Sequence, residues 1–137
     1  MRYKLPKTSD RGRLIAKIGS IHFDILKIRR GGLQCEICGK KTSGIGRFHI
    51  LRTATHPRLR FVDDNVLLAC WMPCHNAWHH FGPNDPRNKR TMARIIELRG
   101  PDYEQKLLER ERYVAKMDGL YLLALKETML KELATLC

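Results

Sequence analysis

The alternation of apolar and polar residues predicts a helix near the start of the chain. Its apolar positions are Leu14, Ile18, Ile21, Ile25 and Ile28. They follow one another at steps of three or four residues, which places them on one face of a helix. Ser9 or Asp10 can cap the start of this helix, and the glycine pair at 31–32 ends it.

Two short apolar runs in the middle of the chain predict strands. The first run covers residues 47–51 and the second covers residues 66–69. A polar turn at 63–65 precedes the second run. A short helix is expected from His75 to about Phe81, where a glycine and a proline follow.

The remaining part of the chain has the periodicity of helices. Their expected ranges are 85–99, 102–117 and 119–136. Asp85 and Asp102 stand where a capping carboxylate is favoured. The apolar run at 120–125 is either part of a core or a surface for self-association. Helices around one short pair of strands predict an α+β fold.

Four cysteines form two close pairs that are far apart in the sequence. They are Cys35 and Cys38, separated by two residues, and Cys70 and Cys74, separated by three. Two such pairs are typical of one tetrahedral Zn²⁺ site. The N-terminus lacks the apolar stretch of a signal peptide, so we expect a cytoplasmic protein with metal-bound thiolates rather than disulfides. Trp71 and Trp78 are expected to pack around the second pair and the short helix that follows it.

Positive charge dominates the 137 residues, with a formal net charge of +12. Residues 1–99 contain 20 Lys or Arg against 7 Asp or Glu, whereas the rest of the chain is nearly balanced. Such a surface attracts a polyanion, most often nucleic acid. Candidate contacts to DNA are Lys40, Lys41, Arg47, Arg52, His56, Arg58 and Arg60. No apolar run reaches the ~20 residues of a membrane span, so no membrane partner is expected.

Histidines gather between and after the cysteine pairs. His75 and His79 are four residues apart, so a helix would place both imidazoles on one face, where they can bind one ion. His80 is the alternative partner. His49, at the first strand, can accept a proton from water near a metal-bound phosphate. The amide of Asn65 can cross the loop between the strands and hold His49 in orientation.

These residues resemble the HNH endonucleases, which have the ββα-metal fold. The matching segments are Cys35-x2-Cys38, Phe48-His49-Ile50, Asp64-Asn65-Val66-Leu67-Leu68, Cys70 and Cys74-His75-x3-His79. The resemblance implies that His49 is the general base, that Asn65 orients it, and that His75 and His79 bind a divalent ion. The string His49-x6-His56-Pro57-Arg58-Leu59-Arg60-Phe61-x3-Asn65 is similar to the NinG/Rap family of phage recombination endonucleases, which cut branched DNA.

The sequence departs from most HNH enzymes just before the general base. Those enzymes have an acid or a histidine there as a metal ligand, and this chain has Phe48. The ion is then one protein ligand short, or His49 itself is a ligand. A further departure is the three-residue spacing between Cys70 and Cys74, where two residues are usual.

Taken together, the sequence predicts one α+β domain over residues 1–137. It would consist of an N-terminal helical segment (1–32), a zinc-stabilised ββα-metal core (33–82) and a C-terminal helical cap (83–137). The expected function is metal-dependent hydrolysis of phosphodiester bonds in DNA, on branched recombination intermediates if the NinG/Rap similarity holds. We expect a structural Zn²⁺ and a catalytic Mg²⁺ or Mn²⁺, with Zn²⁺ or Ni²⁺ as alternatives, and a homodimer through the C-terminal helices. The alternative function is a non-catalytic, zinc-stabilised DNA-binding or phage accessory module.

Overall fold

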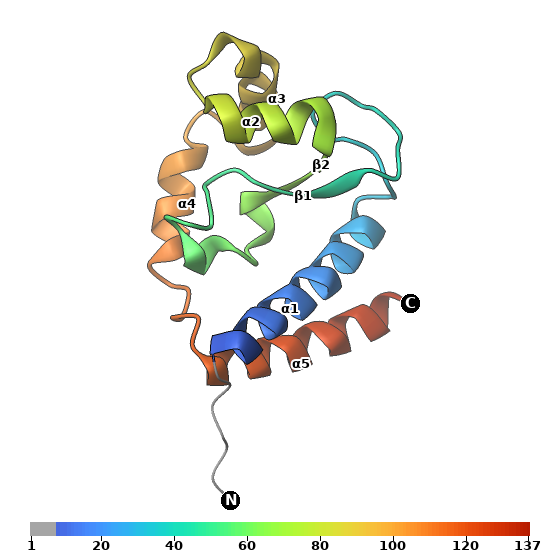
Figure 1. Ribbon diagram of the computed structural model, residues 1–137, viewed down its shortest axis with the longest axis vertical. Coiled ribbons are helices and arrows are strands. Elements are labelled where there is room, and N and C mark those ends of the chain that lie inside the picture. Colours follow the sequence, from blue (N-terminus) through green and yellow to red (C-terminus); the bar gives the residue numbers. More distant parts are fainter. Residues whose placement is uncertain (1–7) are drawn as a thin grey trace, which may run out of the picture. The chain divides into compact units, whose positions relative to one another are not determined.

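The computed structural model describes residues 8–137, with side chains from residue 10 onward (Figure 1). Its chain forms two compact units. The helical unit contains the described residues up to Arg30 together with Ala115–Cys137, and the cysteine unit is Gly31–Val114. The single domain expected over residues 1–137 stays a prediction. The described part combines helices with one two-stranded sheet, which confirms the α+β class.

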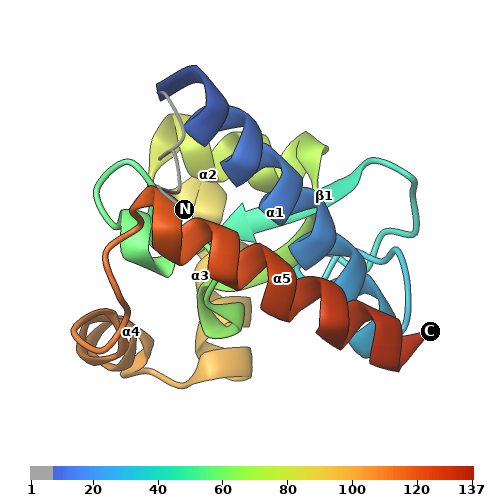
Figure 2. The same ribbon diagram turned by 90° about the horizontal axis from the view of Figure 1, so that it is seen from below.

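The helical unit consists of α1 (Thr8–Arg29) and α5 (Gly119–Leu136), which pack against each other (Figure 1 and Figure 2). Arg11 donates to the carbonyl of Met117 at one end, and Arg29 pairs with Glu132 at the other. The two helices therefore run in the same direction. The predicted apolar face of α1 is buried at three of its positions, and Asp118 caps α5 by accepting from the N–H of Tyr121.

The sheet of the cysteine unit joins β1 (Ile45–His49) and β2 (Val66–Cys70) in antiparallel pairing. Its register sets Ile45 opposite Cys70 and His49 opposite Val66. All five residues of β2 are buried. The sheet therefore places His49 beside the start of β2 and brings Cys70 to its other end.

Three helices follow β2 in the cysteine unit: α2 (Asn76–Phe81), α3 (Lys89–Arg99) and α4 (Tyr103–Glu111). Asp85 accepts from the N–H of Arg87 in the turn before α3, as a capping carboxylate should. The expected helix 102–117 is shorter than predicted: α4 ends at Glu111, and hydrogen bonds that span three residues, such as that from the N–H of Arg112 to the carbonyl of Glu109, replace the helical ones after it. The side chain of Asp102 pairs with Lys106 and does not cap α4.

Large apolar side chains from every part of the cysteine unit form its core. The buried members include Phe48, Leu59, Leu67, Leu68, Trp78, Ile95 and Leu107. Burial of each such side chain contributes roughly 1.5–3 kcal/mol. This core holds β1, β2 and α2 together and so determines where the histidines of these elements lie.

Candidate metal centre and its surroundings

The four paired cysteines converge at one place. Their sulfur atoms all lie within 4.8 Å of one another, and Cys35, Cys70 and Cys74 are buried. Cys38 Sγ lies 3.7 Å from Cys70 Sγ. A tetrahedral ion with Zn–S bonds of about 2.3 Å has neighbouring sulfurs about 3.8 Å apart. The cluster therefore fits a structural metal ion such as Zn²⁺, as the spacing predicted.

A tight backbone turn shapes the first cysteine pair. The N–H of Cys35 donates to the carbonyl of Lys40, and the N–H of Gly39 donates to the carbonyl of Cys35, both at 2.9 Å. Gly39 has a φ of +81°, a left-handed conformation that glycine adopts without strain. The N–H of Cys38 points at Cys35 Sγ, 3.4 Å away. This turn aims both sulfurs of the pair at the same point.

The thiols differ in acidity because their surroundings differ. Burial raises the pKa of Cys35, but hydrogen bonds from the backbone of Cys38, Cys70 and Ile37 outweigh it, so that the pKa falls to about 7. Burial raises the pKa of Cys70, and burial together with the charge of Cys35 raises that of Cys74. Four thiolates at this distance need a cation, and metal binding must displace the protons of the less acidic thiols.

The second cysteine pair leads directly into the histidine-bearing helix. Cys70 ends β2, Cys74 lies in the turn that follows, and His75 immediately precedes α2. His75 Nε2 and His79 Nε2 are 2.8 Å apart. Two cis ligands about 2.1 Å from an octahedral ion would be about 3.0 Å apart. The pair thus fits one shared ion. The ring of His80 lies beside Phe81 instead, at a centroid distance of 6.3 Å.

Both histidines of this pair are poor proton acceptors. Burial and the charge of His79 lower the pKa of His75 to about 4. Burial, together with the charges of Arg52 and His80, also lowers the pKa of His79. Arg52 approaches closely, because its guanidinium donates to the carbonyl of His79 at 2.9 Å. The lowered pKa of each ring favours the unprotonated form, which is the form that binds a metal ion, and the guanidinium of Arg52 beside them could contact an anion.

Phe48 faces this histidine pair from β1. Its fully buried ring lies 5.6 Å from the ring of His75 and 5.3 Å from that of Trp78, between centroids. A hydrocarbon ring therefore occupies the position where the resemblance would place a metal ligand. Among residues 10–137, whose side chains are described, the cysteine cluster is the one group of three or more potential Cys, His, Asp or Glu ligands. An ion at the histidine pair would complete its coordination with water or phosphate oxygens.

His49 is held by the loop between the strands. Its Nε2 lies 2.9 Å from the carbonyl oxygen of Arg60. A nitrogen next to a carbonyl must carry the proton, so Nδ1 is the basic nitrogen of the neutral ring. Arg47 Nη1 donates to the same carbonyl at 3.4 Å. Burial and the charge of Arg60 lower the pKa of Arg47 to about 10.

The amide of Asn65 crosses the loop, which is the geometry expected of it. The side chain is fully buried. Its Oδ1 accepts from the N–H of Leu51 at 2.8 Å, and its Nδ2 donates to the carbonyls of Leu51 and Leu59 at 3.0 and 3.3 Å. These bonds tie the end of β1 to the loop whose Arg60 carbonyl holds His49. The role of His49 as general base, or as a metal ligand in place of Phe48, stays a prediction.

The other expected DNA contacts are spread over the cysteine unit. Lys40, Lys41 and Arg58 are exposed. His56 instead pairs with the carboxylate of Glu111, 3.0 Å away. That contact occupies one nitrogen of its ring and leaves it a weaker candidate for binding phosphate.

Trp71 differs from the sequence expectation. Trp78 is buried with 3% of its surface exposed, as expected, but Trp71 and Met72 are 56% and 53% exposed. The Trp71 ring lies edge-on to His75, at a centroid distance of 5.0 Å. An exposed indole beside the histidine pair can stack on a nucleobase. The extra residue between Cys70 and Cys74 was the available signal, because it lengthens the turn that carries Trp71.

Comparison with protein-family models, with curated proteins and with solved structures finds no match. Across the described chain, no helix is long and apolar enough to cross a membrane.

Proposed function

We propose that the protein is a metal-dependent endonuclease of the HNH type that hydrolyses phosphodiester bonds in DNA. The observation that carries the proposal is the pair His75–His79, whose Nε2 atoms are 2.8 Å apart directly after the cysteine cluster. The order of two antiparallel strands and a short helix, and the loop-crossing amide of Asn65, support it. Branched DNA, the substrate of the NinG/Rap family, belongs to the same proposal.

His49 would activate water in this reaction. Its Nε2 keeps its proton, which it donates to the Arg60 carbonyl, so Nδ1 would take the proton from the attacking water. Asn65 keeps the loop rigid, so that the imidazole does not need to be ordered when substrate binds. Arg52, anchored on the His79 carbonyl, would neutralise charge on the phosphate.

His75 and His79 would hold the divalent ion. When bound, such an ion supplies Lewis-acid stabilisation of the phosphate and of the leaving oxygen. Two imidazoles leave most coordination positions to water and phosphate, an arrangement compatible with Mn²⁺ or Mg²⁺. Because Phe48 adds no ligand, the affinity for this ion should be modest until DNA contributes its oxygens.

The test is cleavage of supercoiled plasmid by wild type and His49→Ala in Mn²⁺ or Mg²⁺. Loss of a general base should slow cutting about 10²–10⁴-fold. The matched control is His56→Ala, which removes a histidine of the same loop that pairs with Glu111. We expect the control to keep most of its rate and both variants to keep their zinc. Undiminished cutting by His49→Ala would remove His49 as the base.

One observation favours a second function, that of a non-catalytic zinc-stabilised DNA-binding module. Phe48 fills the ligand position with hydrocarbon, as a protein without a catalytic ion could. That module would bind DNA with its zinc in place but would not nick it with any divalent ion. Its DNA affinity would also be unchanged in His75→Ala.

A further inference from the structure

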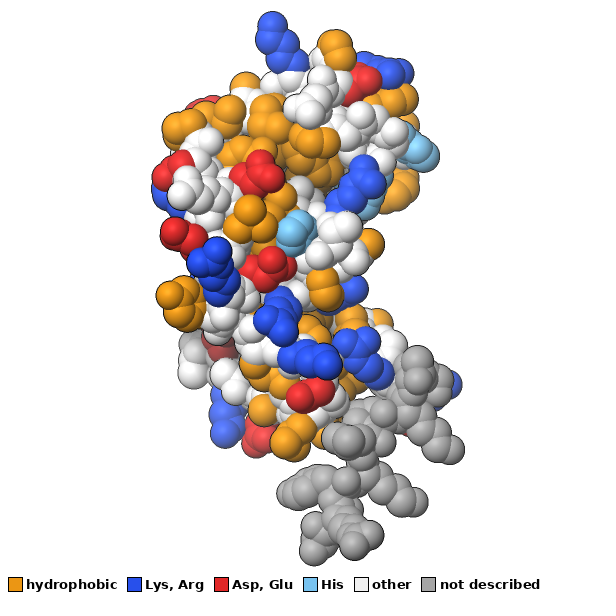
Figure 3. Space-filling view, turned by 90° about the vertical axis from the view of Figure 1, so that its left-hand side faces the viewer, with side chains coloured by type: hydrophobic (Ala, Val, Ile, Leu, Met, Phe, Trp, Pro, Cys, Tyr) orange, Lys and Arg blue, Asp and Glu red, His pale blue; other side chains and the backbone are white. Residues whose placement is uncertain are grey.

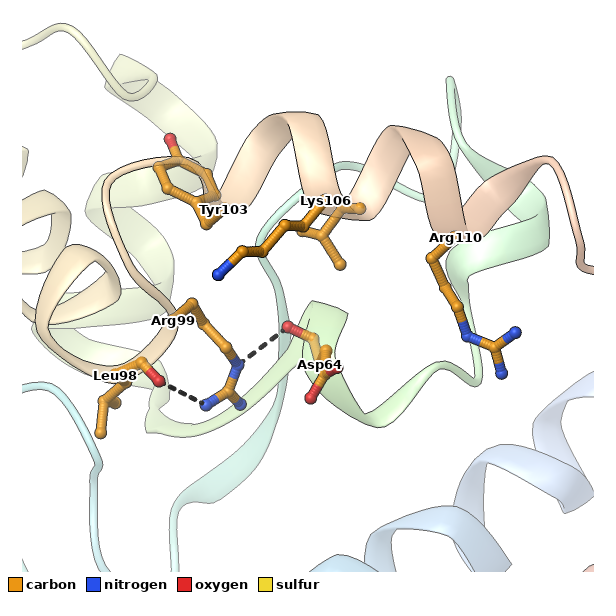
Figure 4. A pocket seen from close by; sticks show the side chains of 7 residues that line it. Asp64, Leu98, Arg99, Tyr103, Lys106 and Arg110 are labelled. Atoms are coloured by element: carbon orange, nitrogen blue, oxygen red, sulfur yellow. Dashed lines mark hydrogen bonds between the residues drawn. The ribbon is translucent and has the colours of Figure 1, made fainter.

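A cationic pocket lies in the cysteine unit and is lined by none of the four clustered cysteines and none of the histidines. It has a volume of about 260 Å³ and lies between Asp64 and helices α3 and α4 (Figure 4). Three cationic side chains line it: Arg99, Lys106 and Arg110. One carboxylate, Asp64, lines it as well. The lining therefore carries an excess of positive charge.

The ends and faces of helices α3 and α4 place the three cations at the pocket. Arg99 ends α3, and its guanidinium donates to the carbonyls of Asp64 and Val66 at 3.0 and 3.2 Å. Lys106 and Arg110 are four residues apart on α4 and so lie on the same face of that helix. The pocket thus combines one arginine whose guanidinium is held by backbone carbonyls with two cationic side chains on α4 that can adjust to a ligand.

The two cations on α4 have at most one weak ion pair between them. Lys106 Nζ lies 3.1 Å from Asp102 Oδ1, but both side chains are exposed, and such pairs are weak. Arg110 forms no ion pair within the part of the chain whose side chains are described. In Figure 4, Lys106 and Arg99 lie on one side of Asp64 and Arg110 on the other. Figure 3 views the protein from the side on which α4 lies, and basic, acidic and apolar side chains are intermixed there.

We propose that this pocket binds a backbone phosphate of the DNA, at a position separate from the bond that is cut. Guanidinium and ammonium groups bind phosphate oxygens through short, charge-assisted hydrogen bonds. The carboxylate of Asp64 repels the phosphate and therefore lowers the affinity of the pocket for it. This inference rests on the proposed function, because the phosphate belongs to the same nucleic acid.

The pocket is connected to the proposed catalytic loop through the backbone. Arg99 holds the carbonyls of Asp64 and Val66, the two chain neighbours of Asn65. Asn65 in turn fixes Leu51 and Leu59. A phosphate bound by Arg99, Lys106 and Arg110 would therefore be fixed relative to His49, and the pocket would help to position the strand for cleavage.

The test compares duplex binding at several salt concentrations, without added divalent ion, for wild type and the double variant Lys106→Gln/Arg110→Gln. Loss of one phosphate contact should lower the slope of log affinity against log salt by about 0.9. The control double variant, Arg13→Gln/Lys131→Gln, removes the same charge from the helical unit and should keep the wild-type slope. Asp64→Asn should bind more tightly than wild type, a gain that misfolding cannot produce.

A second arm separates this inference from the proposed function. Inorganic phosphate is titrated into the protein, and the backbone amide resonances of residues 98–110 are followed by NMR, with chloride as control. We expect shifts in wild type that disappear in Lys106→Gln/Arg110→Gln. Phosphate binding without any duplex binding would overturn the assignment to DNA and the proposed function with it. If phosphate caused no shifts, and the double variant bound duplex like its control, the pocket would be refuted while the nuclease proposal stood.

Discussion

Replacing Asn65 by alanine should destabilise the cysteine unit by an amount that its contacts allow to be estimated. The side chain is fully buried and makes three hydrogen bonds, to the N–H of Leu51 and to the carbonyls of Leu51 and Leu59. Each bond contributes about 1 kcal/mol net, and a buried donor left without a partner costs about 1–3 kcal/mol. We expect the free energy of unfolding to fall by about 3 kcal/mol.

The assay is urea unfolding followed by tryptophan fluorescence at constant, saturating zinc. A Trp71→Phe background leaves Trp78 as the reporter, and its indole is buried in the same unit. Zinc must be constant because a ligand that binds only the folded state adds to stability. An Asn65→Ala protein whose unfolding free energy lies within about 0.5 kcal/mol of its parent would refute the reasoning.

Asn88 provides the matched control for this prediction. It is equally buried, and its Nδ2 donates to the carbonyls of Ala77 and Gly82 at 2.9 and 2.7 Å. Asn88→Ala should therefore cost about 2 kcal/mol, at about 1 kcal/mol per bond, without releasing the loop that holds His49. At a temperature where both variants are folded, Asn65→Ala should cut DNA more slowly than Asn88→Ala. Equal cutting rates would show that Asn65 stabilises the fold without positioning His49.

Two further predictions concern the cysteine cluster and the exposed indole. Because burial raises the pKa of Cys70 and Cys74, zinc must compete with their protons. The apparent zinc affinity, measured by competition with a chelator, should therefore rise from about pH 6 to pH 8. An affinity that does not change with pH would contradict this. Trp71→Ala should weaken binding to single-stranded DNA by about 1–3 kcal/mol in a fluorescence anisotropy titration. Tyr113→Ala, which removes an aromatic ring that is 83% exposed, should leave that affinity unchanged, and equal losses in both variants would argue against stacking on Trp71.

The sequence predicted best those features that depend on local spacing. The convergence of the four cysteines follows from two short turns, and the pairing of His75 with His79 follows from the helical period. The buried run of β2 was long enough to identify. Strand bounds were less accurate, since β1 begins at Ile45 and ends at His49, where the run of apolar residues suggested 47–51. The bounds of β1 are set by its pairing with β2, and this pairing cannot be recognised from the sequence of the first strand alone.

Features that depend on contacts between distant segments could not be predicted. Trp71 was expected to pack, but its exposure depends on the path of the turn between Cys70 and Cys74. The cationic pocket combines Arg99, which ends α3, with two residues of α4, and no spacing in the sequence links Arg99 to them. The pairing of His56 with Glu111 likewise joins two elements that are far apart in the chain. Each of these depends on tertiary packing, which the pattern of single residues does not encode.

The most direct measurement of the central claim is the nicking of supercoiled plasmid by zinc-loaded protein, with and without added Mn²⁺ or Mg²⁺. The cysteine cluster should retain its zinc throughout, while the histidine pair should load only when the second ion is supplied. We predict nicking that depends on the added ion and that stops when this ion alone is withdrawn. Protein that holds one zinc and binds the plasmid, yet leaves it intact with every divalent ion, would contradict the account.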